Sequence, residues 1–316
     1  MSGVTITAGW SFSGGITITE APPPPENTAA WFGGGQYPNT STVNRITYAT
    51  DTATASVRGP LSLARYGLAA AGNQTYGWFG GGTTGYPNTI STVNRITYAT
   101  DTATASVRGP LSAVKYNLAA AGNTTDGWFG GGVGAGLGLV STVDRITYAT
   151  DTATASVRGP LSSARYGLAA AGNTTDGWFG GGQYPNTSTV NRITYATDTA
   201  TASVRGPISS SRVYLAAAGN TTDGWFGGGN LPANTSTVNR ITYATDTATA
   251  SVRGPLSSAR YGLAAAGNTT DGWFGGGQPG TSTVNRITYA TDTATASVRG
   301  PLSAAIYKFA AAGGIQ

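Results

Sequence analysis

Carboxylate side chains recur at fixed places in this chain, and a pair of carboxylates is what hydrolysis of a glycosidic bond requires. Six stand in the repeated motif TDTA, at Asp51, Asp101, Asp151, Asp198, Asp246 and Asp292. Four more are the last residue of the repeated motif NTTD: Asp126, Asp176, Asp223 and Asp271. The remaining acids are Asp144, Glu20 and Glu26. A glycosidase needs two carboxylates in different environments, whereas these are copies of one turn residue. We interpret them as turn caps, with a calcium site built from such a ring as the alternative.

Histidine and cysteine are both absent from the chain. This absence excludes imidazole or thiolate metal sites, nucleophiles that depend on cysteine or on a serine–histidine pair, and disulfide bonds. The GGG runs follow predicted strands, but they open no helix and have no lysine partner, so they do not form a phosphate-binding loop. We therefore expect a protein without cofactors that is not an enzyme.

These residues lie in a repeat of about fifty residues. The marker WFGGG begins at tryptophans that are 47, 50, 50, 47 and 48 residues apart, namely Trp31, Trp78, Trp128, Trp178, Trp225 and Trp273. A block of 22 residues occurs six times, first at Ser41–Ser62. The six copies differ at two positions, where Asp144 replaces Asn and Ile208 replaces Leu. The repeat is rich in Thr, Val, Ile, Tyr and Gly, a composition that favours short strands and tight turns.

Each repeat divides into four predicted strands, here given for one copy: Tyr166–Gly172, Trp178–Gly182, Thr189–Thr197 and Thr201–Pro207. Four short antiparallel strands with this period are typical of a β-propeller blade. Adjacent Trp and Phe should point to opposite faces of the blade and pack against its two neighbours. The alanine-rich strand suits the innermost position, where the blades converge.

The two ends of the repeat region predict a closed ring. The first WFGGG has no LAAAG strand before it, and the last repeat is followed by FAAAG (Phe309–Gly313) with no WFGGG after it. The C-terminal strand can therefore complete the first blade and leave no exposed edge. We predict an all-β fold, a six-bladed β-propeller of four-stranded antiparallel blades over residues 28–316.

The repeat resembles the kelch repeat in its small-residue inner strand, its glycine run (Gly80–Gly82), its tyrosine in the third strand (Tyr98) and its period. The resemblance covers about residues 28–314 and implies a propeller fold. It departs from the usual kelch pattern because Trp precedes the glycines instead of standing in the fourth strand. Some kelch-like propellers are copper oxidases, but this chain lacks the His and Cys ligands that they need.

Sequence variation is concentrated in two parts of the repeat. One is the segment between the second and third strands: Gln36–Thr40, Thr83–Ile90, Val133–Val140, Gln183–Thr187, Asn230–Thr235 and Gln278–Thr281. The other is the link between blades, which reads SLARYG, SAVKYN, SSARYG, SSSRVY, SSARYG and SAAIYK. Strand alternation places both on one face of the disc, while the turns of the opposite face are nearly invariant. One-sided variation favours a binding face over simple loop drift.

The candidate ligand-binding residues lie in these variable parts. From the segments between strands they are Tyr37, Tyr86, Asn88, Leu137, Leu139 and Tyr184; from the links they are Arg65, Lys115, Arg165, Arg212 and Arg260. Val133–Val140 reads VGAGLGLV, and an exposed apolar loop often marks a contact. Basic residues interleaved with tyrosines, Lys308 and Tyr307 included, suit an acidic glycan. The alternative is that the arginines support the rim, and the fully repeated Arg45 and Arg58 classes are expected to pair with acids between blades.

Residues 1–27 differ from the repeats. GVTITAGWSFSGGITITE alternates with a period of two, which predicts a β-hairpin within residues 1–20, and APPPPEN at 21–27 predicts a stiff spacer. This segment resembles short segments of virion proteins of tailed bacteriophages, which also carry kelch-like propellers. The resemblance implies attachment to other virion proteins through residues 1–27, a place on the surface of a phage particle and a homo-oligomeric state.

The combined hypothesis is a non-enzymatic virion propeller whose variable face binds a partner, foremost a host-surface glycan or another surface receptor. The alternatives are a purely structural fibre or decoration protein and an intracellular kelch-like adaptor that binds proteins. Nucleic acid is not expected as a partner, because charged residues make up only 10% of the chain and form no dense basic cluster. Membrane insertion is not expected either, since no apolar run reaches transmembrane length.

Overall fold

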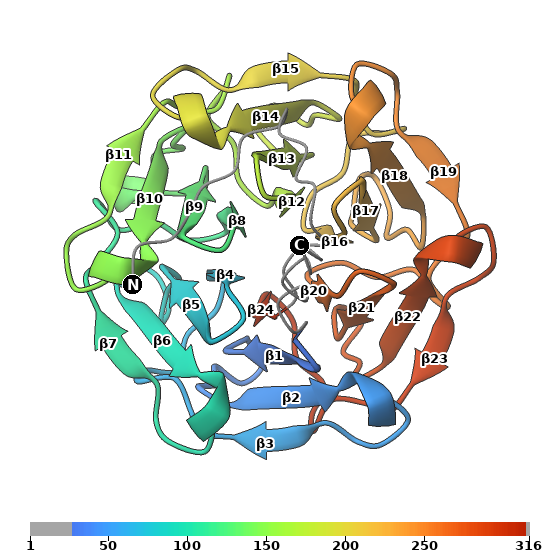
Figure 1. Ribbon diagram of the computed structural model, residues 1–316, viewed down its shortest axis with the longest axis horizontal. Coiled ribbons are helices and arrows are strands. Elements are labelled where there is room, and N and C mark those ends of the chain that lie inside the picture. Colours follow the sequence, from blue (N-terminus) through green and yellow to red (C-terminus); the bar gives the residue numbers. More distant parts are fainter. Residues whose placement is uncertain (1–26, 314–316) are drawn as a thin grey trace, which may run out of the picture.

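The computed structural model describes residues 27–313, so the hairpin predicted for residues 1–20, and the spacer predicted for residues 21–27 except its last residue, lie outside the described residues. Within residues 27–313 the chain forms six four-stranded antiparallel sheets arranged as the blades of a propeller (Figure 1). In sequence order within the blade, blade 2 contains β4 (Ala69–Gly72), β5 (Tyr76–Gly80), β6 (Val93–Thr97) and β7 (Ser106–Arg108). Blade 3 contains β8 (Ala119–Gly122), β9 (Asp126–Gly130), β10 (Val143–Thr147) and β11 (Ser156–Arg158).

The next three blades repeat this pattern. Blade 4 contains β12 (Ala169–Gly172), β13 (Asp176–Gly180), β14 (Val190–Thr194) and β15 (Ser203–Arg205). Blade 5 contains β16 (Ala216–Gly219), β17 (Asp223–Gly227), β18 (Val238–Thr242) and β19 (Ser251–Arg253). Blade 6 contains β20 (Ala264–Gly267), β21 (Asp271–Gly275), β22 (Val284–Thr288) and β23 (Ser297–Arg299).

Blade 1 combines the two ends of the described chain. Its sheet has the order β24 (Ala310–Ala312), β1 (Ala29–Gly33), β2 (Val43–Thr47) and β3 (Ser56–Arg58). The innermost strand β24 pairs with β1 in the register Trp31 to Ala312 and Gly33 to Ala310. The predicted closure of the ring by the C-terminal strand is therefore confirmed, and the six-bladed propeller with it.

Three of the four strands in each repeat are shorter than the sequence pattern predicts, and the second keeps its predicted length but begins two residues earlier. The first strand of each repeat begins at the alanines, and the second ends before the last two glycines, because Gly181 and Gly182 adopt φ angles of +71° and +117° that leave the extended region. The third strand ends at Thr, and the following YAT forms a single 3-10 turn in every blade: η1 (Tyr48–Thr50), η2 (Tyr98–Thr100), η4 (Tyr148–Thr150), η5 (Tyr195–Thr197), η6 (Tyr243–Thr245) and η7 (Tyr289–Thr291). One further turn, η3 (Ala135–Leu137), lies in a variable segment.

The hydrophobic core is a set of six clusters, each lying between two adjacent blades. The indole of Trp31 stacks on the ring of Tyr98 in the next blade, with ring centroids 3.8 Å apart and planes 8° apart. Phe32 points the other way and packs in the cluster of the preceding blade, with Trp273. The prediction that Trp and Phe face opposite neighbours is confirmed, and the same stack recurs around the ring.

The TDTA aspartates connect neighbouring blades, so interpreting them as turn caps was wrong. Asp101 of blade 2 accepts a hydrogen bond from the Trp31 indole at 2.8 Å. The same carboxylate pairs with Arg45 at 3.1 Å and with Arg58 at 3.5 Å, both from blade 1. The other five TDTA aspartates make the equivalent bonds. The expected pairing of the Arg45 and Arg58 classes with acids between blades is confirmed.

Each copy of the motif VRGP needs glycine at its third position for a steric reason. A Cβ atom on Gly59 would lie 1.9 Å from the carbonyl oxygen of Ala103 in the next blade, and the five equivalent glycines meet the same obstacle. Its N–H donates to the Asp101 carbonyl at 2.8 Å. The chain that follows each outer strand can therefore lie against the TDTA turn of the next blade because glycine has no side chain.

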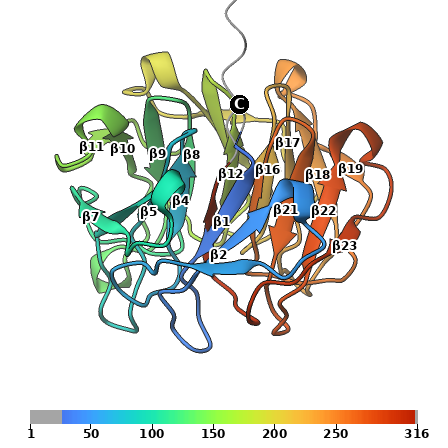
Figure 2. The same ribbon diagram turned by 60° about the horizontal axis from the view of Figure 1, so that its bottom comes forward.

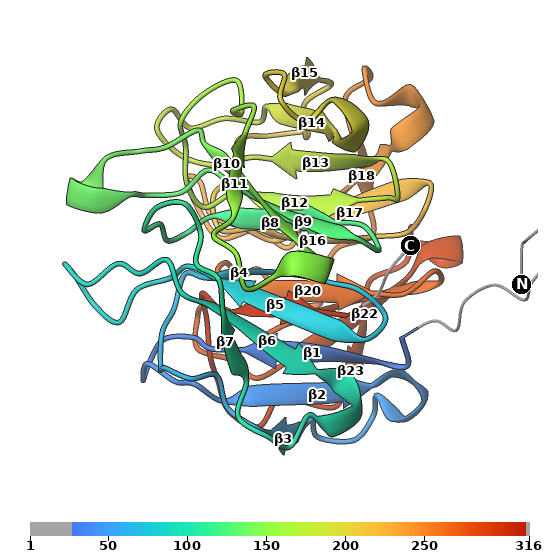
Figure 3. The same cartoon turned by 60° about the vertical axis from the view of Figure 1, so that its left-hand side comes forward.

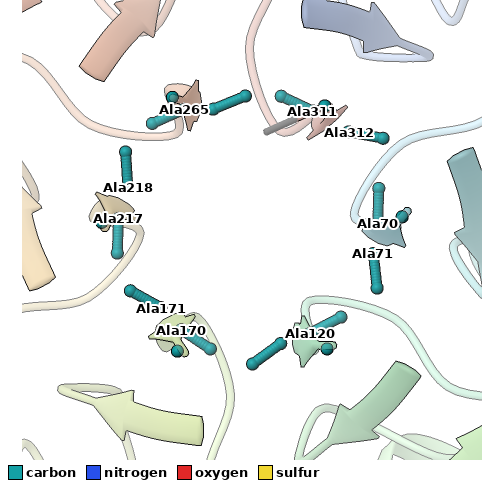
Figure 4. Close-up of a pocket in the computed structure, with 18 residues that line it drawn as sticks. Ala70, Ala71, Ala120, Ala170, Ala171, Ala217, Ala218, Ala265, Ala311 and Ala312 are labelled. Atoms are coloured by element: carbon teal, nitrogen blue, oxygen red, sulfur yellow. The ribbon is translucent and has the colours of Figure 1, made fainter. Parts of the chain in front are cut away.

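The inner strands line a narrow axial channel of about 100 Å³ (Figure 4). Alanine side chains from every blade face it, including Ala70, Ala120 and Ala217. The prediction that the alanine-rich strand is innermost is confirmed. Within the described residues, no helix is long and apolar enough to cross a membrane.

The two faces of the disc differ (Figure 2). The 3-10 turns of the YAT segments lie on one face, here called the repeat face. The loops between second and third strands and the links between blades meet on the other, here called the variable face, where they join in backbone bridges such as Tyr116 to Val133 and Tyr166 to Gln183. The prediction that both variable regions share one face is confirmed.

Candidate functional site

The links between blades form a closed ring of hydrogen bonds at the mouth of the channel on the variable face. In each link the residue just before the Leu or Phe that leads into the innermost strand has a left-handed backbone, with φ between +52° and +68°. Its N–H donates to the carbonyl of the equivalent residue in the preceding blade at 2.6–2.8 Å. Around the ring these residues are Lys308, Gly67, Asn117, Gly167, Tyr214 and Gly262.

Glycine and non-glycine residues alternate in this ring. Glycine is the usual residue for a left-handed backbone, so Asn117, Tyr214 and Lys308 are the exceptions. The glycine positions are crowded by the next link: a Cβ on Gly67 would lie 2.7 Å from Asn117 Oδ1, and one on Gly167 would clash with Val213 Cγ2. Side chains at every second position therefore fill the space over the channel mouth.

The three non-glycine side chains contact one another. Lys308 Nζ lies 4.6 Å from the ring centroid of Tyr214, and Asn117 Nδ2 donates to the Tyr214 hydroxyl at 3.3 Å. Together they form the floor of a hollow of about 580 Å³ on the variable face. The hollow is lined by Tyr66, Tyr116, Asn117, Val133, Leu137, Leu139, Tyr166, Tyr184, Tyr214 and Lys308.

Tyrosine rings continue beyond the hollow in a row across the variable face. Successive ring centroids are 5.3–6.3 Å apart along the series Tyr184, Tyr166, Tyr214, Tyr261, Tyr307 and Tyr37. Burial raises the pKa of Tyr116, Tyr166 and Tyr214 above the ordinary value for tyrosine. Their hydroxyls therefore stay protonated at neutral pH and serve as both donors and acceptors.

The predicted loop residues divide into two groups. Leu137, Leu139 and Tyr184 line the hollow, and Leu137 and Tyr184 are 52% and 61% exposed. Tyr37, Tyr86 and Asn88 are also exposed on the variable face but lie outside the hollow. In Figure 3 the green loop after β9, which carries Leu137, projects far out from the variable face.

The predicted basic residues are inside the protein, which corrects their expected role as a ligand-binding set. Arg65, Lys115, Arg165, Arg212 and Arg260 are at most 1% exposed. Arg65 donates to the Phe79 carbonyl at 3.0 Å, and Arg165 and Arg260 make the equivalent bond. Burial lowers the pKa of Arg65, Arg165, Arg212 and Arg260 to about 10. Each of the four buried arginines donates to backbone carbonyl oxygens that would otherwise lack a partner inside the protein.

Of the basic residues in the links, Lys308 is the one that lines the hollow, and no carboxylate lines it with Lys308. The structure also shows no cluster of three or more acidic groups that could hold a metal ion anywhere in residues 27–313.

Sequence reasoning did not single out Asn117, and it grouped Tyr214 and Lys308 with the other tyrosines and basic residues of the links without recognising their place in the ring. The sequences of the links do contain a pattern that could have revealed these residues. When RYGL, KYNL, RVYL and IYKF are aligned, Asn, Tyr and Lys stand at the position where the first segment has glycine. Tyr214 thus stands one residue later than the tyrosines with which it had been grouped, and Lys308 stands two residues later than the arginines.

Blade 3 carries a buried Lys–Asp ion pair at places where blade 6 has an arginine and an asparagine. Lys115 Nζ lies 2.8 Å from Asp144 Oδ2, and both side chains are at most 1% exposed. In blade 6 the same places hold Arg260 and Asn285, which hydrogen-bond at 2.9 Å. The one Asp among the repeated Asn residues is therefore explained by the one Lys among the link arginines.

We predict that Asp144→Asn alone lowers the free energy of unfolding by about 2–3 kcal/mol, because it leaves the Lys115 ammonium buried without an opposite charge. The double variant Lys115→Arg with Asp144→Asn restores the pair found in blade 6 and should recover most of this loss. Denaturant unfolding of the three proteins measures both effects. Equal stability of the single and double variants would contradict the coupling.

Neither a protein family model nor a curated protein matches this chain. The kelch-like and virion resemblances therefore stay interpretations of the sequence pattern. The structure shows the six-bladed propeller fold.

Proposed function

We propose that this chain is a non-enzymatic binding protein whose variable face recognises a host-surface glycan. The observation that carries the proposal is the hollow of about 580 Å³ with tyrosine walls, which interrupts an otherwise repetitive surface. Its volume lies within the range of about 300–1,000 Å³ that is usual for ligand sites.

The chemistry of the walls suits sugars. A sugar ring has apolar C–H faces that pack on aromatic rings, and its hydroxyls need donors and acceptors around the edge. Tyr66, Tyr116 and Tyr166 can supply both, because each lines the hollow and carries an aromatic ring and a hydroxyl. A peptide would also find apolar contacts here, but the hollow offers no exposed sheet edge or long groove to hold its backbone.

The apolar loop Val133–Val140 gives the hollow one of its walls. Val133, Leu137 and Leu139 line it directly. The shorter segment QYPNT stands at the same place in blades 1 and 4. Specialisation of this one loop therefore builds an asymmetric site on a nearly sixfold scaffold.

The described start of the chain lies on the face opposite the hollow. Asn27 donates to the carbonyl of Asn73 in the turn between β4 and β5, and Tyr48 N–H donates to the carbonyl of Thr28. Both contacts belong to the repeat face. This placement supports attachment through the N-terminal segment on one side and ligand binding on the other. We propose that the segment joins other virion proteins of a phage particle, in a homo-oligomer that presents the variable face outward.

The test is binding of the full chain to intact candidate host cells and to their extracted polysaccharides. We predict that replacing residues 133–140 by QYPNT, or replacing Leu139 by Ser, weakens binding at least tenfold, since each removes part of the wall. Val157→Ser is the control, because Val157 is equally apolar and 57% exposed on the outer strand β11, away from the hollow.

Two outcomes would contradict the proposal. Equal losses in the Leu139 and Val157 variants would place the binding surface elsewhere. Incorporation into particles without binding to any cell or polysaccharide would favour the purely structural role.

A further inference from the structure

Lys308 occupies a position where other blades have glycine. Blades 2, 4 and 6 place Gly67, Gly167 and Gly262 in the same left-handed conformation, and Lys308 adopts it with φ of +54°. A lysine there is strained relative to glycine. Strain retained at the floor of a ligand site points to a role for the side chain in that site.

The ammonium of Lys308 sits among tyrosine rings. Its Nζ lies 4.6 Å from the ring centroid of Tyr214, 5.6 Å from that of Tyr307 and 6.0 Å from that of Tyr66. Rings attract a cation without neutralising it, and no carboxylate lines the hollow beside it. Burial also lowers the pKa of Lys308 below its ordinary value.

The other basic groups of the described chain are already engaged or covered. The Arg45 and Arg58 classes pair with the TDTA aspartates, Lys115 pairs with Asp144, and the link arginines are buried beneath the loops. Within residues 27–313, Lys308 is thus the cation that the hollow offers to a ligand.

We propose that Lys308 makes this site selective for acidic glycans, whose sugar carboxylate pairs with the Lys308 ammonium while the sugar ring packs on the tyrosines. This inference rests on the proposed glycan-binding function. The hydroxyls of Tyr66 and Tyr116 line the same hollow and can donate to the second carboxylate oxygen or to neighbouring sugar hydroxyls. A charge-assisted contact of this kind is among the strong hydrogen bonds.

The test compares two pairs of sugars that differ in a single group. Galacturonic acid and glucuronic acid carry a carboxylate where galactose and glucose carry a hydroxymethyl group. Titrations of the full chain with each sugar, followed by NMR, give dissociation constants in the millimolar range and above. We expect the acids to bind about tenfold more tightly than the neutral sugars at pH 7.

Three variants locate the effect. Lys308→Gly installs the residue of blades 2, 4 and 6, so it should fold, and it should abolish the preference for the acids over the matching neutral sugars. Lys308→Gln should do the same without changing the length of the side chain greatly. Lys308→Arg keeps the charge and should retain most of the preference.

The dependence on pH supplies an independent readout. The preference should disappear as the pH falls below the pKa of the sugar carboxyl, near 3–4, because the ligand then loses its charge. Lys308 stays protonated through that range, so the protein side of the contact does not change.

The outcomes separate this inference from the proposed function. Equal affinity of wild type for acidic and neutral sugars, or a preference that Lys308→Gly retains, overturns the role of Lys308 and leaves glycan binding standing. No binding of either kind of sugar, together with no binding of host polysaccharide, overturns both.

Discussion

Replacing Asp101 by alanine is expected to lower the free energy of unfolding by about 3–5 kcal/mol, because it removes the shared acceptor of one inter-blade contact. The Trp31 indole and the Arg45 and Arg58 guanidinium groups all lose their bond to this carboxylate. The carboxylate is 6% exposed, so water cannot readily replace it for the buried indole. Urea unfolding followed by tryptophan fluorescence measures the change.

Asp101→Asn serves as the matched control. The amide oxygen still accepts from the Trp31 indole, and the two arginines are 20–29% exposed and remain partly hydrated. We therefore expect a loss of about 1–2 kcal/mol, well below that of alanine. Equal losses in both variants would show that the charge alone matters, and a loss below 1 kcal/mol in Asp101→Ala would contradict the inter-blade role.

Raising the pH well above 10 is expected to unfold the propeller. Five of the six tyrosines that stack on tryptophan have pKa values raised by burial, namely Tyr98, Tyr148, Tyr195, Tyr243 and Tyr289. The unfolded chain releases its tyrosine protons near pH 10 while the folded chain keeps them. The folded state then binds more protons, so stability falls as pH rises, by about 1.4 kcal/mol per pH unit for each tyrosine.

Four buried arginines act in the opposite direction, because burial lowers their pKa to about 10. Deprotonation of these groups in the folded state would favour folding above pH 10. We expect the effect of the tyrosines on stability to dominate. Arginines such as Arg65 and Arg212 donate hydrogen bonds to backbone carbonyls, and a guanidinium resists deprotonation.

The measurement is a pH titration that records circular dichroism and tyrosinate absorbance together. The absorbance of the five stacked tyrosines should appear in the same transition as the loss of structure. In Tyr148→Phe the dependence of stability on pH should be shallower by about 1.4 kcal/mol per pH unit. Ionisation of these tyrosines near pH 10 in a chain that remains folded would contradict the prediction.

The repeat itself determined much of the fold. Adjacent Trp31 and Phe32 must face opposite ways in a strand, so each blade was bound to pack on both neighbours, as the clusters around Trp31 and Phe32 show. The missing first strand at one end and the extra FAAAG at the other determined closure. Alternation of antiparallel strands also determined that loops such as Val133–Val140 share a face with the links.

Only the tertiary structure decided which side chains line the hollow on the variable face. Arg65 and Tyr66 are neighbours in an irregular link, and their order in the sequence does not say which side chain turns inward. In the structure Arg65 is buried and donates a hydrogen bond to the Phe79 carbonyl. Asp101 looked like a turn residue because its partners Trp31 and Arg45 come from another blade, 70 and 56 residues away. The hollow exists because the ring brings Asn117, Tyr214 and Lys308 together over one axis. Sequence periodicity describes each blade, but contacts across the axis depend on how all six blades close.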